Sequence, residues 1–457
     1  MWGVPGERLR DVIVEFSAHE KYPAPLFQFS WRLLMHPLGW ATHIALLGIL
    51  GQGLAYGLAV VLARTLAVDA FETYAVVSAA FVLMVTPVLQ GLDKYALQLL
   101  PAMAERAEWG AVRVYLAFVT RRTLVASLLL GAAVAVWAWW LSGLPLAARQ
   151  ALLVCGLSLP AGALVHFAHE ALTALGHAFT ATAIFRIAVP VMALALFGLL
   201  AIGATQASAA VAVGSWGLAW GVALVLMVGV LRRAVPPVAL PVLSVPGVQA
   251  WAIQARPFWF YRVALAALGQ MGIIGLHALG APSAAVGAFA AAMGTAGLAL
   301  VIVTATNRVF ARQLSVLLAR REFDAIAALR QQRLRWLAMP IGLYLLGTLV
   351  FAPEILGFFR PEFVQQGATA LRLLALAVAF MMLFALAPTY LKFRRRNRWI
   401  YQAVGLAAAA QMALLWLLVP RLGATGAALA YVVSMCGLYG GMALLAYREL
   451  RLLRQAQ

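Results

Sequence analysis

The chain has 457 residues, of which 64% are hydrophobic and 11% are charged, and its formal net charge is +19 at pH 7. Soluble globular proteins carry roughly a quarter charged residues, so this composition excludes a water-soluble protein. The basic residues stand in short gaps between long apolar runs, which the positive-inside bias of membrane proteins explains better than nucleic-acid binding does. The sequence therefore predicts a polytopic membrane protein that binds membrane lipid and no nucleic acid.

Apolar runs follow one another along almost the whole chain. A hydrocarbon core of roughly 30 Å needs about 20 residues of helix to cross it. Run length and flanking charges predict an all-α protein with about twelve transmembrane helices. The spans are expected at residues 39–63, 70–91, 122–142, 150–174, 179–203, 208–231, 257–279, 281–306, 336–359, 366–391, 398–419 and 424–446.

Lysine and arginine gather in every second gap between these spans. The opposite gaps hold little more than Arg64, Arg149, Arg360 and Arg421. This asymmetry predicts that both termini lie in the cytosol. The gaps expected on the cytosolic side hold Lys94, Arg106, Arg113, Arg121, Arg122, Arg232, Arg233, Arg256, Arg308, Arg312, Arg320, Arg321, Arg330, Arg333, Arg335, Lys392, Arg394, Arg395, Arg396 and Arg398.

A proline-rich stretch after the sixth span, with Pro236, Pro237, Pro241 and Pro246, predicts a linker between two lobes. We expect a cytosolic N-terminal segment at 1–37, a first lobe at 38–231, a linker at 232–256, a second lobe at 257–447 and a cytosolic tail at 448–457. An even number of crossings returns the chain to the side where it started. Both six-helix lobes therefore enter the membrane from the same side. They should form a parallel repeat around a central cleft.

Two parts of the chain are similar to a known superfamily. Ala63-Arg64-Thr65-Leu66 and Gly91-Leu92-Asp93-Lys94 resemble the N-terminal lobe of polysaccharide and oligosaccharide flippases, the Wzx-like branch of the multidrug/oligosaccharidyl-lipid/polysaccharide exporter (MOP) superfamily. The segment from Pro420 to Ala428 resembles the turn between the last two core helices of that superfamily. The resemblance implies a MOP-like or MATE-like fold with two lobes.

The same resemblance implies a function in polysaccharide biosynthesis or export. A lipid-linked oligosaccharide on an undecaprenyl-pyrophosphate-like carrier would be turned from the inner to the outer leaflet of the bacterial inner membrane by alternating access. Polysaccharide polymerase and glycosyltransferases are the implied partners.

The chain carries no P-loop, HExxH or GxSxG motif. Cys155 and Cys436 lie in separate apolar runs and suggest no disulfide or metal site. We therefore expect a transporter rather than an enzyme, with no catalytic residues, metal or cofactor.

A pyrophosphate head group is anionic, so the cleft of a flippase should be lined by cations, whereas an exporter of organic cations would carry carboxylates there. Arg186 lies inside the fifth span and Arg262 inside the seventh, where a guanidinium can bind phosphate oxygens. Arg262 follows Phe258 to Tyr261 and is equally suited to snorkelling at the interface. The hypothesised head-group site consists of Arg186, Arg262, Lys94, Gln52, Gln270 and Arg64.

Three titratable residues share one helix face in the fourth span. His166, His169 and Glu170 are spaced i, i+3 and i+4 and are candidates for ion coupling, or alternatively form a solvated helix end. The alternatives for the whole chain are a MATE-like multidrug or cation antiporter, a major facilitator transporter, a membrane-embedded glycosyltransferase or ligase, and a membrane anchor for cytosolic enzymes. No acidic residue is expected at the middle of a span, which argues against the antiporter.

Overall fold

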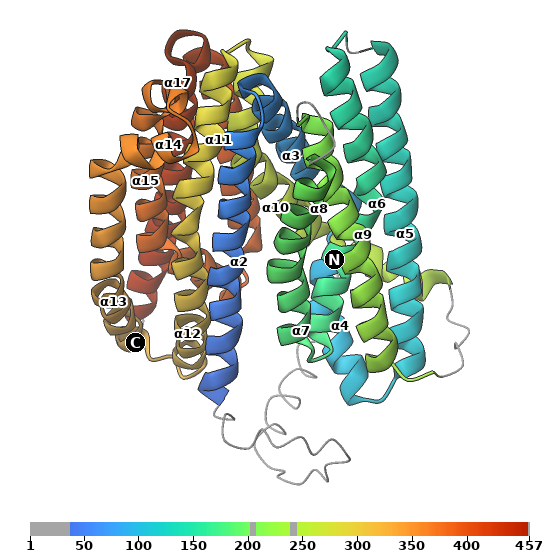
Figure 1. Ribbon diagram of the computed structural model, residues 1–457. Helices are drawn as coiled ribbons and strands as arrows, with labels where there is room; N and C mark the ends of the chain where they lie inside the picture. The colour runs from blue at the N-terminus through green and yellow to red at the C-terminus, as the bar shows by residue number, and fades with distance from the viewer. Residues whose placement is uncertain (1–36, 142, 202–206, 238–244, 456–457) are drawn as a thin grey trace. The chain divides into compact units, whose positions relative to one another are not determined.

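The computed structural model describes residues 37–141, 143–201, 207–237 and 245–455. The N-terminal segment expected at 1–37 falls outside these ranges except for its last residue, as do residues 238–244 of the expected linker. Residues 43–457 form one compact unit. Within the described ranges the chain contains helices and no strand (Figure 1), which confirms the predicted all-α class.

The described helices follow one another with short connections, and two π-helical segments interrupt them. In chain order the elements are α2 (Pro37–Thr65), α3 (Val68–Val88), α4 (Leu92–Glu105), α5 (Trp109–Val136), η2 (Trp137–Leu141), α6 (Leu146–Ala174), α7 (Ala178–Ala183), η3 (Ile184–Ala188), α8 (Val189–Ala201), α9 (Ala209–Ala234), α10 (Val245–Ala278), α11 (Ser283–Leu298), α12 (Leu300–Ala319), α13 (Phe323–Val350), α14 (Ala352–Phe359), α15 (Glu362–Phe384), α16 (Leu386–Phe393) and α17 (Asn397–Gln455).

In the part of the chain that the structure describes, ten helices are long and apolar enough to cross a membrane, and the bent pair α13 and α14 makes an eleventh. The 59 residues of α17 are far more than one crossing requires, at about 1.5 Å per residue. The backbone of α17 leaves the helical region at Gly423, where φ is 53°. Because α17 therefore contains the last two expected spans, the structure agrees with about twelve crossings.

The ninth expected span, 336–359, is not one straight helix, because α13 and α14 meet at a bend of 70°. Pro353 has no backbone N–H and leaves the carbonyl of Leu349 without its helical donor. The Arg372 side chain of α15 donates a hydrogen bond of 2.9 Å to this carbonyl. A side chain from the neighbouring helix thus stabilises the bend.

The chain between the second and third expected spans, and between the eighth and ninth, is in each case two helical segments joined by one tight turn. The turns contain Ala107 and Arg321, whose φ angles are 56° and 58°. In each turn the preceding arginine and the following glutamate form an ion pair, with N–O distances of 4.0 and 3.9 Å. The helices that follow, α5 and α13, begin 13 residues before the third and the ninth expected spans, respectively.

Most of the linker expected at 232–256 is also helical, since α10 begins at Val245.

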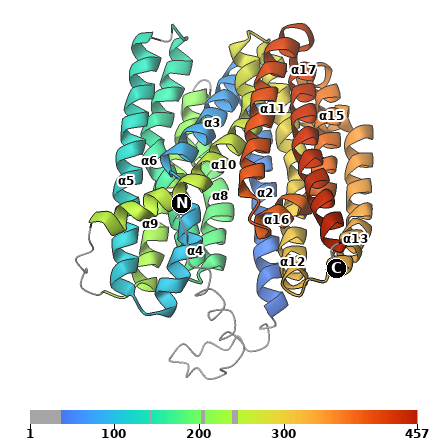
Figure 2. The same ribbon diagram turned by 180° about the vertical axis from the view of Figure 1, so that it is seen from behind.

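The helices pack in two groups, which both views show side by side (Figures 1 and 2). One group contains α4 to α9, the other contains α11 to α17, and α3 and α10 contact helices of both groups. Small residues allow close crossings, since a Cβ on either Gly131 of α5 or Gly156 of α6 would collide with the other backbone. Such crossings are typical of helices packed within a bilayer.

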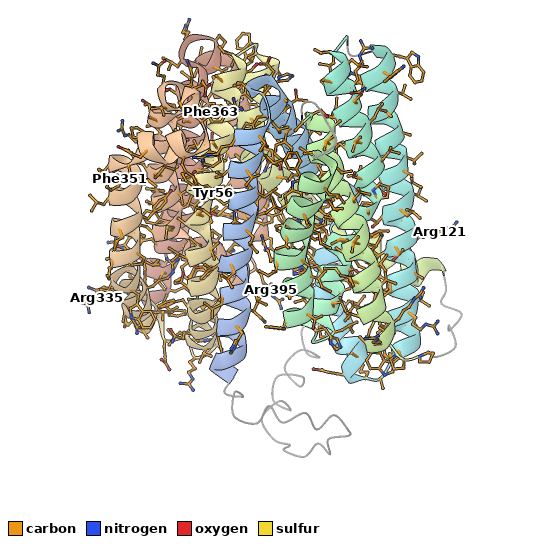
Figure 3. The ribbon with its side chains drawn as sticks, viewed as in Figure 1. Tyr56, Arg121, Arg335, Phe351, Phe363 and Arg395 are labelled. Atoms are coloured by element: carbon orange, nitrogen blue, oxygen red, sulfur yellow. The ribbon has the colours of Figure 1, made fainter. Side chains whose placement is uncertain are left out.

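The clustered arginines mark one end of the helices, which we call the arginine-rich end. The connections α4–α5, α12–α13 and α16–α17 lie there. Figure 3 shows Arg335 toward this end, whereas Phe351 and Phe363 lie toward the opposite end. Because α13 begins at Phe323, Arg333 is a helix residue and its side chain is 1% exposed. Arg333 therefore differs from the loop anchor that the sequence led us to expect.

Candidate functional site

A cavity of about 320 Å³ lies between α2, α3, α6, η3, α9 and α10. Two of the three arginines predicted for the head-group site, Arg186 and Arg262, line it, together with His166. No carboxylate is among the described residues that form its wall. We call it the arginine-lined cavity.

The position of Arg186 follows from its local sequence. Pro190 stands four residues after Arg186 and has no N–H to donate to the Arg186 carbonyl. The chain widens at this point into the π-helical segment η3, and such segments are frequent at functional sites. Helix α2 approaches this segment at Gly51, where a Cβ would collide with the carbonyl and Cβ of Arg186. The proline and the glycine together place Arg186 beside the cavity.

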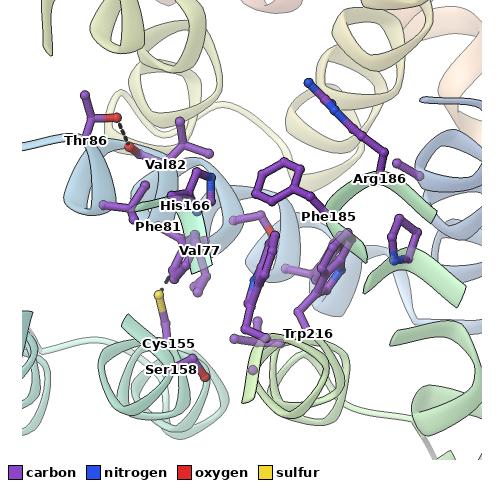
Figure 4. Close-up of a pocket in the computed structure, with 18 of the residues that line it drawn as sticks. Val77, Phe81, Val82, Thr86, Cys155, Ser158, His166, Phe185, Arg186 and Trp216 are labelled. Carbon is purple, nitrogen blue, oxygen red and sulfur yellow. Dashed lines mark hydrogen bonds between the residues drawn. The ribbon is translucent and has the colours of Figure 1, made fainter. Parts of the chain in front are cut away.

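The guanidinium of Arg186 is the least neutralised charge of this site. Its side chain is exposed in the structure, and its Cζ lies 5.5 Å from the centre of the Phe185 ring. Figure 4 shows the side chain extending beyond Phe185 and away from Trp216. Among the residues that the structure places, none forms a hydrogen bond or ion pair with this guanidinium. Its donors are therefore available to an anion.

Arg262 is held by a carboxylate that the sequence had not indicated as part of the site. Its Nη1 forms an ion pair with Oδ2 of Asp93, the second residue of α4. The Asp93 side chain is 1% exposed, whereas that of Arg262 is 27% exposed. Oδ1 of Asp93 has no hydrogen-bond partner among the placed residues. The charge of Arg262 is therefore largely compensated from within the protein.

The turn between α3 and α4 brings Asp93 to Arg262. Gly91 has a φ of 74°, and a Cβ there would collide with the backbone of α10 at Ala255 and Trp259. Trp259 also donates a hydrogen bond of 3.1 Å to the carbonyl of Pro87. Ala255, Trp259 and Arg262 are spaced i, i+4 and i+7, so they share one helix face. The close contact at Gly91 therefore directs Arg262 toward Asp93.

The predicted ion-coupling residues fall into two environments. Glu170 accepts a hydrogen bond of 2.5 Å from Lys94 and lies 3.8 Å from Nδ1 of His169. His166 instead lines the arginine-lined cavity, and its Nδ1 lies 2.8 Å from the carbonyl of Gly162. Lys94, which we expected at the head-group site, is thus paired with Glu170 and does not line the cavity.

Aromatic rings form a continuous wall on one side of the cavity. The rings of His166 and Phe185 meet edge to face at 4.9 Å, and the Trp216 and Trp220 rings stack at 5.9 Å. Trp216 donates a hydrogen bond of 2.9 Å to the hydroxyl of Tyr74. The wall is rigid because its rings pack on one another, and it presents apolar faces together with N–H and O–H groups.

The two predicted glutamines, Gln52 and Gln270, line a second cavity of about 260 Å³. This cavity shares four lining residues with the arginine-lined cavity, so the two adjoin along α2 and α3. The structure therefore brings Gln52 and Gln270 to a common space beside Arg186 and Arg262. The shared residues are Ala55, Tyr74, Ser78 and Val82.

Arg64 lies apart from both cavities, at the opposite end from the arginine-rich loops. Its Nε donates a hydrogen bond of 2.7 Å to the carbonyl of Phe358, and its Cζ lies 4.6 Å from the centre of that ring. Arg360 in turn donates hydrogen bonds to the carbonyls of Ala63 and Leu66. The structure thus places Arg64 in a contact between α2 and α14 rather than with the other predicted residues.

The sequence argument missed Asp93 as the partner of Arg262, and it missed the aromatic wall. Asp93 stands in the segment Gly91-Leu92-Asp93-Lys94, where a lone acidic residue after an apolar run was the available signal. Trp216 and Trp220 are spaced i, i+4 on one helix, and this spacing alone does not separate a cavity wall from a core. Only the placement of α9 beside η3 decides that.

Solved structures with the same arrangement of helices are transporters. The chain superposes on an inward-facing multidrug-resistance MATE family transporter of the MOP superfamily with a TM-score of 0.69 at 13% identity, over 89% of this chain and 96% of that one. A mutant of the Vibrio cholerae MATE transporter VcmN gives a TM-score of 0.64 at 17% identity, over 90% and 95% of the two chains. The chain therefore has the same MATE-like fold as these transporters.

A third similar structure is a MOP superfamily transporter from Pyrococcus furiosus, for which a reverse polarity of the binding pocket suggests a different function. Its TM-score is 0.59 at 12% identity, over 94% of this chain and all of that one. In sequence, the chain matches no protein-family model and no curated protein. The structural similarity, at these low identities, establishes the fold.

Proposed function

We propose that this protein is an alternating-access transporter that carries an anionic, pyrophosphate-bearing lipid with a saccharide head, from the inner to the outer leaflet of a bacterial inner membrane. The observation that carries this proposal is the unpaired guanidinium of Arg186 beside a cavity whose described wall has no carboxylate. Arginine binds phosphate oxygens in a planar, bidentate geometry. The orientation, with both termini in the cytosol, is that expected from the positive-inside bias.

The other features of the site agree with this cargo. The aromatic wall supplies apolar ring faces and polar edges, a combination suited to sugar rings. Gln52 and Gln270 supply amide donors and acceptors in the adjoining cavity. Polysaccharide polymerase and glycosyltransferases would then supply or use the cargo. An inside-negative membrane potential favours outward movement of each negative charge by about 2.3 kcal/mol per 100 mV when the charge crosses the full field.

The nearest alternative is a multidrug or cation antiporter, because two of the similar structures are named as multidrug-resistance MATE family transporters. Such a cargo needs a free carboxylate in the cavity. Among the described residues, Asp93 is paired with Arg262 of the cavity wall and Glu170 is paired with Lys94, so neither carboxylate is free. The reverse pocket polarity described for the Pyrococcus furiosus protein is a precedent within this fold for a cavity of opposite charge.

The test is binding of an isoprenyl pyrophosphate to the purified protein in detergent, measured by calorimetry. Arg186→Ala should weaken binding at least about tenfold, because charge-assisted hydrogen bonds contribute about 1.5–3 kcal/mol. Arg398→Ala, which removes an exposed arginine near the arginine-rich end, is the matched control and should leave the affinity unchanged. Preferential binding of an organic cation, unaffected by Arg186→Ala, would favour the antiporter instead.

Export is tested in cells that lack the gene. Lipid-linked glycan should accumulate in the inner leaflet, and the unmodified chain should restore its export while Arg186→Ala should not. Surface glycan that persists in the deletion strain, in the absence of a paralogue, would argue against a flippase. Full restoration by Arg186→Ala would remove that residue from the proposed site.

A further inference from the structure

A third cavity, of about 520 Å³, lies at the arginine-rich end of the second group of helices. It is enclosed by α12, α13, α15, α16 and α17 and shares no lining residue with the two cavities described above. Figure 2 shows the end of α17 beside α12, α13 and α16. We call it the α13–α17 cavity. Most of its wall is apolar, and it includes Leu314, Ile326, Leu383, Phe384, Ala443 and Leu444.

The charged residues of this wall are two arginines, with no carboxylate among the placed residues that line it. Arg330 is exposed, and its Cζ lies 5.9 Å from the centre of the Tyr447 ring. Within the described ranges it forms no ion pair. Arg454 lies 3.2 Å from Oδ1 of Asp324, but the Asp324 side chain is 92% exposed. An ion pair so open to solvent is weak, so Arg454 can exchange Asp324 for another anion.

A buried hydroxyl also lacks a partner here. Tyr390 lines the cavity and is 4% exposed, and its hydroxyl forms no hydrogen bond with the residues that the structure places. Leu444 and Tyr447 are 51% and 50% exposed, so the cavity is open toward the outer surface of α17. In a protein that spans a membrane, that surface faces lipid.

We propose that the α13–α17 cavity binds an anionic phospholipid. The apolar wall would hold part of an acyl chain, and Arg330 and Arg454 would bind the phosphate. Basic pockets between transmembrane helices are recurrent sites for anionic head groups. A water-soluble anion would leave the apolar wall unused, and a zwitterionic lipid would find no carboxylate in the described wall for its cationic group. This site does not depend on the proposed cargo, because the two cavities lie in different groups of helices.

A bound lipid would fill the space between the start of α13 and the end of α17. These two segments are joined by the hydrogen bond of 3.1 Å from Arg454 to the carbonyl of Phe323, by the exposed ion pair of Arg454 with Asp324 and by the contact of Arg330 with the Tyr447 ring. We therefore expect the lipid to stabilise the second group of helices against thermal unfolding. Ala443→Trp, which places a large ring in the cavity, should remove the stabilisation by added lipid.

The experiment is native mass spectrometry of the purified protein titrated with phosphatidylglycerol and, separately, phosphatidylcholine. The double variant Arg330→Ala/Arg454→Ala should bind phosphatidylglycerol at least about tenfold more weakly. The matched control, Arg448→Ala/Arg451→Ala, removes two exposed arginines of α17 that do not line the cavity, and should change binding less than about twofold. Thermal unfolding with and without phosphatidylglycerol provides a second measurement.

Three results would overturn the proposal. Equal loss of binding in the control variant would show that the lipid is attracted by the overall positive charge of the arginine-rich end and not by Arg330 and Arg454. Equal affinity for phosphatidylcholine would show that the two arginines do not select an anionic head group. An unchanged rise in the melting temperature of Ala443→Trp on adding phosphatidylglycerol would show that the lipid binds elsewhere. Since all four arginines are partly or fully exposed, their removal should leave the fold intact.

Discussion

Asp93 and Arg262 form an ion pair that joins α4 to α10, and the carboxylate in this pair is 1% exposed. Removing one partner of a buried pair leaves an unpaired charge, which destabilises a protein by about 3–5 kcal/mol. We expect Asp93→Ala and Arg262→Ala each to lower stability by an amount near the lower end of this range, because Arg262 is partly exposed. The double variant should be more stable than the sum of the two losses predicts, as thermal unfolding in detergent can measure. Simple additivity would show that the two residues are not coupled.

The pair also controls how much charge faces the arginine-lined cavity. Asp93→Asn keeps the shape of the side chain but removes its charge, so Arg262 becomes available to an anionic cargo. We expect this variant to bind an isoprenyl pyrophosphate several times more tightly than the unmodified protein. Asp324→Asn, which neutralises an exposed carboxylate far from this cavity, is the control. Weaker binding in Asp93→Asn would mean that the ion pair positions Arg262 for the cargo.

Gly51 allows α2 to pack on the carbonyl of Arg186. A methyl group at this position would collide with that carbonyl, so we expect Gly51→Ala to lower the stability by about 1–3 kcal/mol and to displace Arg186. Gly53 lies two residues along the same helix, where a methyl group would meet no neighbouring atom within 4 Å, and Gly53→Ala should be tolerated. The two melting temperatures test this difference. Equal effects would contradict the close approach.

Arg360 caps the end of α2 by donating to the carbonyls of Ala63 and Leu66. Because α2 and α14 lie far apart in sequence, this contact holds two parts of the fold together at the end opposite the arginine-rich loops. We expect Arg360→Ala to increase amide hydrogen exchange in residues 62–67, since each lost hydrogen bond contributes about 1 kcal/mol. Arg421→Ala, which removes an exposed arginine elsewhere in the chain, should leave exchange in this segment unchanged. Unaltered exchange in Arg360→Ala would contradict the capping role.

Arg333 is buried in α13 and donates hydrogen bonds of 3.1 Å to Oδ1 of Asn307 and 3.2 Å to the carbonyl of Leu383. Arg333→Ala would leave both acceptors unsatisfied and create a cavity, so we expect a loss of about 3 kcal/mol or more in unfolding free energy. Arg335→Ala, two residues away and exposed, should change the stability by less than about 0.5 kcal/mol. Unfolding in a denaturing detergent measures both. A mild effect of Arg333→Ala would show that water or lipid replaces its hydrogen bonds.

The sequence by itself determined the membrane class, the all-helical fold and the approximate number of crossings. Each of these depends on the length and polarity of a single local run, which a single sequence displays directly. It also made Arg186 and Arg262 candidate site residues, because a charged residue inside an apolar span is energetically costly, and the structure brings both to one cavity. It did not give the bend between α13 and α14, whose stability depends on Arg372 from another helix.

Only the tertiary structure decided which of the predicted cations are available. Arg262 is neutralised by a residue 169 positions away, and Lys94 by one 76 positions away. Arg64 does not lie at the site, because it donates a hydrogen bond to the carbonyl of Phe358, 294 positions away. Such pairings are set by the way the helices cross, for which run lengths and charges along the chain carry no information. The physical reason is that the sequence states which side chains are charged, whereas the neutralisation of each charge depends on its distance in space from a group of opposite charge.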